Sequence, residues 1–285
     1  MLNLLANPAG DLWSWQLFPK FNWFRTNEEF SPKISLNINS GAYRIKTAGN
    51  DSDLKEVLKI RKRIFHYEFS GKMLSLRTER DQFDSEADHL MIIDNETDEC
   101  VGVYRILCSV FADKFYAATE FHLDQILDLP GTKIELSRAC ILKEHRNGQV
   151  LNLLWKGIAA YAQRSGADWL FGLSSVQTTD IKEIVTINKY LEANNYCGNA
   201  YSVSPHADFK IDDFEYHSSN FFPLTEQQDD RVADLLPPLF QLYLKAGAKV
   251  CPSPVIDSKM RCADWLTVLK LKELSPSFAR RFMRT

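Results

Sequence analysis

The sequence lacks the features that carry a protein into or across a membrane. No run of apolar residues reaches the ~18 to 20 positions that a membrane-spanning helix needs. The opening stretch, Met1 to Ala6, contains no basic region of the kind that begins a secretory signal peptide. These absences predict a cytoplasmic protein without a spanning helix.

An excess of positive charge is missing too, and the cysteines are not clustered. The 34 Lys and Arg residues are outnumbered by 37 Asp and Glu residues, and the net charge of −3 argues against a nucleic-acid-binding protein. No C-x-x-C pair and no histidine at zinc-binding spacing accompanies the six cysteines, at positions 100, 108, 140, 197, 251 and 262. We therefore expect free thiols in a reducing compartment and no metal site.

Two common nucleophile patterns are absent as well. Ser174 and Ser175 lie in the run GLSSV, which is not the G-x-S-x-G elbow of serine hydrolases. Cys140 is near His145, but this spacing matches no known thiol-nucleophile signature. Any catalytic groups are therefore expected elsewhere in the chain.

What the sequence does contain is typical of a folded protein of mixed class. Its 285 residues, 45% hydrophobic and 25% charged, can bury a substantial core. Apolar or alternating runs predict strands at 43–47, 89–93, 101–108, 133–142, 168–174 and 263–271. Helical spacing predicts helices at 53–69, 149–164 and 184–193, and a helical region from 216 to 247 that Pro237 and Pro238 break or start. Asn50 to Asp53 offers an N-terminal cap for the first helix and Gly166 a C-terminal cap for the second. Strands mixed with helices on one sheet predict an α/β (α+β) fold.

The two ends of the chain differ from the middle in composition. Segment 1–41 is rich in aromatic residues, with basic neighbours Lys20 and Arg25, and segment 274–285 is a basic tail containing SFARRFMR. Aromatic and basic residues together favour the headgroup zone of a bilayer, so a peripheral contact with the inner membrane is one hypothesis. Packing onto the protein's own surface is the other. The compact domain is expected at 42–273.

The first predicted helix carries a charged residue on its apolar face. Counting from Leu54, the buried stripe passes through Arg61. A buried guanidinium without a partner costs several kcal/mol, so it needs carboxylates, and Asp81 and Asp84 are the nearest downstream candidates. A purely structural ion pair would explain this residue equally.

Further charges lie inside two apolar strands. Arg105 interrupts the run VYRIL, and Glu135, Ser137 and Arg138 interrupt KIELSRAC. A single charge in a strand often faces solvent. Several opposed charges spread over three apolar segments instead indicate a polar network assembled in a cleft.

An ordered set of motifs in this sequence resembles one known group of enzymes. The set is Arg61-x-x-x-Phe65, Asp81-x-x-Asp84, Tyr104-Arg105-Ile106-Leu107 and Glu135-Leu136-Ser137-Arg138. It resembles the acyl-carrier-protein-dependent branch of the GNAT superfamily, which includes acyl-homoserine-lactone synthases and ornithine-lipid N-acyltransferases. Longer segments of the sequence are most similar to the ornithine-lipid branch. They are RKRIFHYEF, DQFDSEADHLMIID, FYAATEF, ELSRACI, LLWKGIA, LPPLFQLYLKAGAKV, Pro254-x-x-Asp257 and Ala263-Asp264-Trp265-Leu266. The likeness covers about 43 to 270 and implies a GNAT-like three-layer sandwich, with a mixed, largely antiparallel sheet between helices.

The sequence also departs from patterns of the wider superfamily. Autoinducer synthases carry a tryptophan between the Phe and the first Asp of the series, and none occurs between Phe65 and Asp81. This disfavours a homoserine-lactone product. The phosphate loop of CoA-dependent members, Q/R-x-x-G-x-G/A, is represented only by the degenerate run 145–150 (HRNGQV). This disfavours acyl-CoA as the donor without excluding it.

The resemblance implies an N-acyltransferase with no bound cofactor. It would move a 3-hydroxy fatty acyl group from the phosphopantetheine of acyl carrier protein to the α-amine of an amino acid, ornithine first, and so make a lyso-aminolipid. Glycine, lysine or a polyamine as acceptor is an alternative with the same chemistry. A non-catalytic module that binds acyl carrier protein or lipid is a further alternative, and a membrane-perturbing protein would rest on the aromatic ends alone.

Roles for individual residues follow from the resemblance. Glu135 is expected to be the general base, with Ser137 and Arg138 beside it and a backbone N–H of the strand 135–140 facing the oxyanion. Strict alternation places Glu135 and Arg138 on opposite faces, so we expect a bulge if both line one site. The acceptor's charges and the loop after the first helix would be held by Arg61, Phe65, Asp81, Asp84 and Arg105.

The donor side is expected at the start of the second long helix. Gly148 would place backbone N–H groups near the phosphopantetheine phosphate. Lys143, Arg146 and Lys156 would form a basic docking surface for an acidic carrier protein, although a solvated helix face explains them as well. Leu154, Trp155, Leu239 and Leu242 fit either an acyl tunnel or the core.

Overall fold

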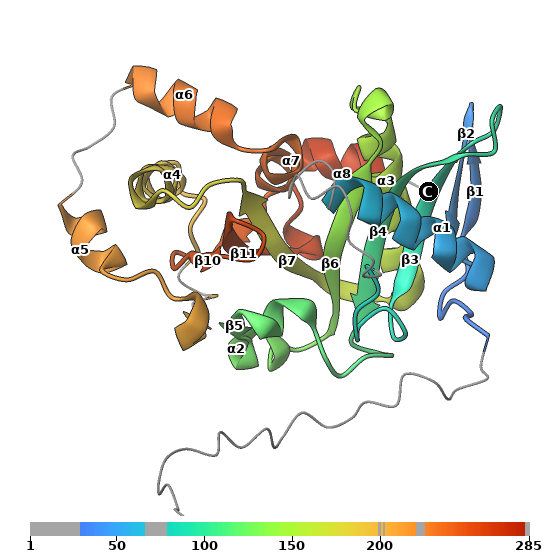
Figure 1. Cartoon of the computed structure of the whole chain (residues 1–285), viewed down its shortest axis with the longest axis horizontal. Coiled ribbons are helices and arrows are strands. Elements are labelled where there is room, and N and C mark those ends of the chain that lie inside the picture. Colours follow the sequence, from blue (N-terminus) through green and yellow to red (C-terminus); the bar gives the residue numbers. More distant parts are fainter. Residues whose placement is uncertain (1–28, 66–78, 199–200, 202, 221–225, 283–285) are drawn as a thin grey trace, which may run out of the picture.

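The computed structural model describes residues 29–65, 79–198, 201, 203–220 and 226–282. Within these residues the chain forms one large sheet with helices on both faces (Figure 1). The sheet has nine strands in the order β1-β2-β3-β4-β6-β7-β11-β10, and β9 also pairs with β11. All neighbouring strands are antiparallel except β6 and β7, which are parallel. The predicted mixed, largely antiparallel sheet between helices is confirmed.

The strands of the large sheet are β1 (Asn37–Ser40), β2 (Tyr43–Thr47), β3 (Asp88–Asp94), β4 (Cys100–Cys108), β6 (Thr132–Ile141), β7 (Ala167–Val176), β9 (Lys249–Val250), β10 (Val255–Asp257) and β11 (Cys262–Lys270). A separate pair consists of β5 (Phe121–His122) and β8 (Ser204–Pro205). The α-helices are α1 (Asp51–Lys62), α2 (Asp124–Leu127), α3 (Gln149–Ser165), α4 (Ile181–Ala193), α5 (Phe214–Ser219), α6 (Glu226–Leu235), α7 (Pro238–Ala246) and α8 (Pro276–Phe282). Short 3-10 turns are η2 (Tyr116–Thr119), η3 (Lys143–His145), η5 (Ala207–Phe209) and η6 (Leu271–Glu273).

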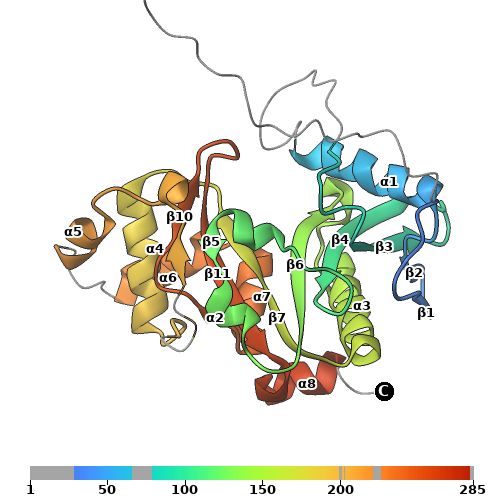
Figure 2. The ribbon, with the colours of Figure 1, turned by 90° about the horizontal axis from the view of Figure 1, so that it is seen from below.

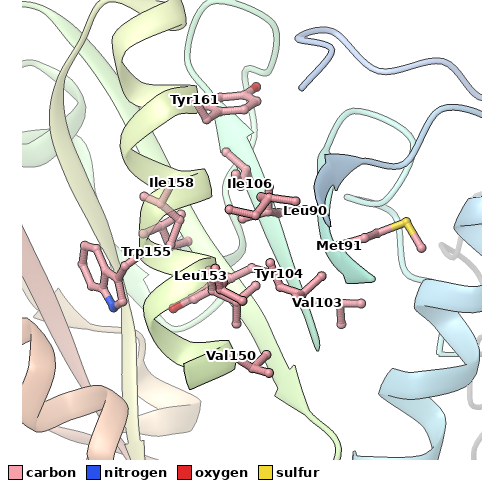
Figure 3. Packing of buried hydrophobic residues seen from close by; sticks show 14 of the residues in the cluster. Leu90, Met91, Val103, Tyr104, Ile106, Val150, Leu153, Trp155, Ile158 and Tyr161 are labelled. Atoms are coloured by element: carbon pink, nitrogen blue, oxygen red, sulfur yellow. The ribbon is translucent and has the colours of Figure 1, made fainter. Parts of the chain in front are cut away.

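Helices α1 and α3 cover opposite faces of the strands β3 and β4 (Figure 2). Side chains alternate along these strands, so each strand contributes apolar residues to both faces of the sheet. Leu90, Tyr104 and Ile106 point toward α3, whereas Met91 and Val103 point away from it (Figure 3). Gly157 lets α3 approach closely, because a Cβ at this position would lie 2.7 Å from Leu90 and 2.8 Å from Ile45.

The predicted caps and several element bounds agree with the structure. The Asn50 side chain accepts a hydrogen bond from the Asp53 N–H, and Gly166 ends α3 with a φ of 64°. The first helix ends at Lys62, followed by a π turn at 63–65, and the rest of its predicted length lies outside the described residues.

The helical region expected from 216 to 247 is three helices, α5, α6 and α7. Leu236 and Pro237 separate α6 from α7, and Pro238 opens α7, where its missing N–H costs no helical hydrogen bond. Gly247, with a φ of 103°, ends α7.

The chain ends are packed where the structure describes them. Strand β1 joins the sheet before Ala42, and the N–H groups of Lys33 and Ile34 donate to Asp88 at 2.7 and 2.9 Å. The aromatic cluster of residues 13–24 lies outside the described residues. In α8, Phe278 and Phe282 are buried against Trp155, while Arg280 and Arg281 stay exposed. None of the helices in the described part of the chain has both the length and the apolar character to cross a bilayer.

Candidate active site

A β-bulge in β6 determines which side chains meet on one face of the sheet. Arg105 pairs with Ser137 and Val103 pairs with Cys140, so two residues of β6, Arg138 and Ala139, lie opposite Tyr104 alone. Arg138 adopts a left-handed conformation with a φ of 57°, which is uncommon for a residue with a side chain. The extra residue turns Arg138 to the face occupied by Ser137 and Arg105, so the expected bulge is present.

Arg61 and Asp84 form a fully buried ion pair beneath this face. The Arg61 Nη1 donates to the Asp84 Oδ1 at 2.6 Å, and its Nη2 donates to the Glu79 carbonyl at 2.7 Å. Both side chains have almost no exposed surface. Burial alone would raise the pKa of Asp84, but the attraction of Arg61 and Arg105 outweighs it and lowers this pKa to about 2.

Arg105 connects this pair to Asp81 and to the bulged strand. Its Nη1 donates to both carboxylate oxygens of Asp81, at 2.6 and 2.7 Å, and to the Asp84 Oδ1 at 3.1 Å. Its Nε donates to the Ser137 Oγ at 2.9 Å. Arg138 reaches the same carboxylate, with its Nη2 3.4 Å from the Asp81 Oδ2. The predicted residues of α1, β4, β6 and the loop before β3 therefore meet in one network.

Aromatic rings cover the arginines of this network. The Arg138 guanidinium lies 4.7 Å from the ring centre of Tyr116 and 5.4 Å from that of Phe65, and Arg105 lies 5.3 Å from that of Tyr116. Within the described residues the Arg138 Nε has no hydrogen-bond partner, although it is buried. Of the three arginines Arg138 is the most exposed, at 17% of its side chain, compared with 1% or less for Arg61 and Arg105. A ligand therefore has access to Arg138 first.

Glu135 is buried in β6, two residues before Ser137, and its carboxylate holds the turn η2 in place. Its Oε2 accepts the Tyr116 N–H at 2.7 Å and its Oε1 accepts the Ala117 N–H at 2.6 Å. Burial raises the pKa of Glu135 to about 7, against the opposing effects of these two N–H groups and of Arg105. A carboxyl that changes charge near neutral pH is suited to accept a proton during a reaction.

The sheet opens beside Glu135. Strands β6 and β7 pair from Thr132 with Ala167 to Glu135 with Phe171. Past Glu135, β6 continues to pair with β4, and β7 continues to pair with β11. Over the same stretch β6 and β7, both described in full, no longer pair with each other. Leu136 and Gly172 still approach closely, since a Cβ at Gly172 would lie 2.3 Å from the Leu136 carbonyl oxygen, and beyond them the facing backbone groups of β6 and β7 take no part in a shared ladder.

A second group of charges lies on the β11 side of this opening; Asp257 and Asp264 occur in the motifs that carry the resemblance, but the sequence analysis gave this group no role in the site. Glu120 follows η2, Asp264 is opposite Ser175 of β7, and Asp257 ends β10; all three are buried. Two signals were visible in the sequence, an acid within the apolar run FYAATEF and another within ADWLTVLKL. Nothing in the sequence indicated that they meet, because their segments are distant along the chain.

The predicted donor-side residues are divided between two places. Lys143, Arg146 and Gly148 are exposed in the connection from β6 to α3, where the Arg146 Nε donates to the Ile141 carbonyl at 2.9 Å and Gly148 is the N-cap residue of α3. Lys156 lies two turns into α3 and donates to the Ser40 Oγ at 3.2 Å on the edge strand β1. Leu154 and Trp155 are core residues, and the apolar niche beside Trp155 has a volume of about 10 Å³, too small for an acyl chain.

Comparisons with known proteins agree with this arrangement. A family profile described as an acetyltransferase (GNAT) domain matches residues 60–156, which run from the last residues of α1 through Asp81, Asp84 and the strands β3, β4 and β6 into α3. An L-ornithine N(alpha)-acyltransferase of Rhizobium meliloti (strain 1021) is 28% identical over 244 residues, which cover 81% of this chain and 80% of that protein. The protein of the same name from Brucella abortus (strain 2308) is 26% identical over 255 residues, covering 84% and 88%.

The solved structures that are similar to this chain share little sequence with it. An N-acyl amino acid synthase from uncultured soil microbes, FeeM, is 9% identical with a TM-score of 0.44, covering 84% of this chain and 93% of that one. The acyl-homoserine-lactone (AHL) synthase LasI is 13% identical with a TM-score of 0.45, covering 87% and 95%. The resemblance to ornithine-lipid N-acyltransferases is confirmed by the sequence relatives: residues 60–156 match a GNAT domain, the chain is similar over most of its length to L-ornithine N(alpha)-acyltransferases, and it is an acyltransferase.

Proposed function

We propose that this acyltransferase moves a 3-hydroxy fatty acyl group from acyl carrier protein to the α-amine of an amino acid, with ornithine as the acceptor and a lyso-aminolipid as the product. The observation that carries the proposal is the position of Glu135, a buried carboxyl with a pKa of about 7 at the point where β6 and β7 separate. The sequence relatives named L-ornithine N(alpha)-acyltransferase support the choice of acceptor.

Aminolysis of a thioester requires a neutral amine. The α-ammonium of the acceptor gives a proton to Glu135, directly or through a water molecule, and the freed nitrogen attacks the thioester carbonyl carbon. The C–N bond forms, the C–S bond breaks, and the thiolate of the carrier leaves and takes up the second proton, which the attacking nitrogen loses as it becomes an amide. Backbone N–H groups of β6 past Glu135, on the edge that β7 leaves open, stabilise the oxyanion of the tetrahedral intermediate.

The three arginines bind the acceptor or position the residues that do. Arg138 binds the α-carboxylate of the acceptor, because its buried Nε has no hydrogen-bond partner in the described chain and its side chain is partly exposed. Arg61, Asp84 and Arg105 act as positioning residues that fix Asp81 and Ser137 beneath it. Phe65 packs against the Arg138 guanidinium and limits its orientations.

The donor binds at the start of α3. Lys143 and Arg146 attract the acidic carrier protein, and N–H groups of the first turn of α3, beyond that of Gln149, which donates to the Asn147 Oδ1, take the phosphopantetheine phosphate. Lys156, held at β1, is a peripheral contact at most. The N-terminal segment 1–41 brings the enzyme to the inner membrane, where a lyso-aminolipid with one acyl chain would be released.

Intact-mass measurement of the carrier protein tests the proposal. Purified enzyme is incubated with 3-hydroxyacyl carrier protein, or with the matching acyl-CoA, and with ornithine, lysine, glycine or a polyamine. We expect the carrier to lose its acyl group with ornithine and the CoA ester to react far more slowly. Loss with another amine only would replace the acceptor, a preference for CoA would replace the donor, and no loss with any amine would refute acyl transfer to amines.

A further inference from the structure

Three acidic side chains converge on the far side of the opening from the arginines. Glu120, Asp257 and Asp264 are 1%, 7% and 3% exposed. Asp264 is held by the Ser175 hydroxyl and by the Cys262 thiol, whose Sγ lies 3.4 Å from its Oδ2. Asp257 accepts the N–H groups of Lys259 and Met260 at 2.7 and 3.1 Å. Both aspartates are thus oriented by their own partners.

Glu120 is the member of this group that has a free oxygen. Its Oε2 is buried and accepts no hydrogen bond from any residue that the structure describes. Burial and the charges of Asp264 and Asp257 raise the pKa of Glu120 to about 9, and Arg138 only partly opposes them. No Lys or Arg nitrogen of the described residues lies within ion-pair distance of the three carboxyls. Glu120 is hydrogen-bonded to Asp264, so this pair of carboxyls holds a proton, and among the described residues no cation neutralises the group.

The acidic group shares its supporting elements with the proposed general base. The turn η2 donates two N–H groups to Glu135 and ends at Glu120, whose own N–H bonds to the Ala117 carbonyl at 3.1 Å. On the sheet, Phe171 pairs with Glu135 and Ser175 pairs with Asp264, on the same strand and the same face. Phe171 and Ser175 are ~13 Å apart along β7, and Glu135 and Asp264 lie on the strands to either side of β7, so their Cα atoms are ~16 Å apart.

The length of this interval indicates what could bridge it. The two amines of ornithine are ~6 Å apart in an extended chain with bonds of ~1.5 Å. A hydrogen bond of ~2.8 Å at each end brings the span to ~12 Å, which is of the same order as the ~16 Å between the Cα atoms of Glu135 and Asp264 less the reach of their side chains. A metal ion fits less well, since the described residues hold no group of three or more His, Cys, Asp or Glu side chains arranged to ligate one.

We propose that Glu120, Asp257 and Asp264 form a subsite for the side-chain ammonium group of the acceptor, so that the enzyme selects amino acids with a second, cationic amine. The inference rests on the proposed function, because it needs an amino acid bound with its α-amine at Glu135. It adds the residues that choose the acceptor and the direction in which the acceptor lies.

Two consequences distinguish this subsite from a structural cluster of acids. An acceptor without the second amine leaves buried carboxyls unpaired, so norvaline, which is ornithine without the δ-amine, should react with a kcat/KM lower by ~10²-fold or more. The proton that Glu120 carries in the free enzyme must also leave when an ammonium group binds. At pH 7, ornithine should therefore release about one more proton on binding than norvaline does.

The experiment measures kcat/KM by thiol release for ornithine, lysine, 2,4-diaminobutyrate and norvaline, and proton release by calorimetry in two buffers of different ionisation enthalpy. It uses the wild type, Glu120→Gln, Asp264→Asn and the control Asp124→Asn, which changes an exposed carboxylate on α2, four residues after Glu120. We expect Glu120→Gln and Asp264→Asn to reduce the ornithine-to-norvaline ratio by ~10-fold or more, mainly through KM, and Glu120→Gln to abolish the additional proton release. The control should match the wild type.

Equal kcat/KM for ornithine and norvaline in the wild type would overturn the subsite while leaving the proposed acyl transfer intact. Turnover with none of these acceptors would instead refute the proposed function. Because the acceptor series is measured on the wild type, the inference stays testable even if a variant fails to fold.

Discussion

Replacing Asp84 by asparagine should destabilise the fold by about 3–5 kcal/mol, the usual cost of removing one partner of a buried ion pair. The Asp84 carboxylate accepts hydrogen bonds from Arg61, Arg105 and the Asp81 N–H, at 2.6, 3.1 and 2.8 Å. Asparagine keeps the size and one acceptor oxygen but removes the charge that compensates Arg61. Asp81, whose nearest oxygen is 3.9 Å from Arg61, compensates it only weakly. The loss is a large part of the roughly 5–15 kcal/mol by which domains are stable.

Urea unfolding at pH 7, followed by tryptophan fluorescence, measures this cost. The matched control is Asp98→Asn, which removes an Asp–Arg pair of 3.1 Å on the surface, where Arg44 is 37% and Asp98 85% exposed. That pair should contribute less than about 1 kcal/mol. If Asp84→Asn were no more destabilising than Asp98→Asn, the network would not be desolvated and the reasoning would be wrong.

The pH dependence gives the same prediction an independent check. Arg61 and Arg105 hold the pKa of Asp84 at about 2 in the folded protein, below its ordinary value of 3.8. The stabilisation is therefore complete above pH 4 and is lost as the pH falls from about 4 to about 2, by about 2 kcal/mol. Asp84→Asn should lack this part of the acid sensitivity.

Three further predictions concern the base, the donor and the packing of α3. Glu135→Gln should lower kcat by ~10²-fold or more, and the wild-type kcat should rise with pH through about 7, since only the ionised carboxylate accepts a proton; unchanged turnover in steady-state assays would remove Glu135 from the mechanism. Arg146→Glu should raise the KM for the carrier protein at low salt, with a smaller difference at ~1 M salt, whereas a salt-independent effect would argue against electrostatic docking. Gly157→Ala should lower the melting temperature, because overpacking against Leu90 costs about 1–3 kcal/mol; an unchanged melting temperature would mean that α3 moves away freely.

The parts of the site that follow from local pattern could be predicted from the sequence. Helical spacing alone places Arg61 on the buried face of α1, and a buried arginine needs a carboxylate, which Asp84 supplies. The bulge at Arg138 could be expected, because strict alternation would place Glu135 and Arg138 on opposite faces of the sheet although the resemblance assigns both to one site.

The acidic group could not be predicted in this way. Glu120 and Asp264 meet through the pairing of β7 with β11 and the folding of η2 over the sheet, and neither contact has a periodic signal. Tyr116 was missed for a related reason, since its backbone N–H, which contacts Glu135, is independent of its residue type. Long-range pairing of this kind is decided by tertiary packing and not by local propensity.

The most direct test of the account is to determine which nitrogen of ornithine receives the acyl group. Ornithine labelled with ¹⁵N at the α position is incubated with enzyme and 3-hydroxyacyl carrier protein, and the product is fragmented in a mass spectrometer. With the α-amine at Glu135 and the δ-ammonium at Glu120 and Asp264, the acyl fragment should carry the ¹⁵N label. An acyl group on the unlabelled δ-nitrogen, or no amide at all, would contradict the account.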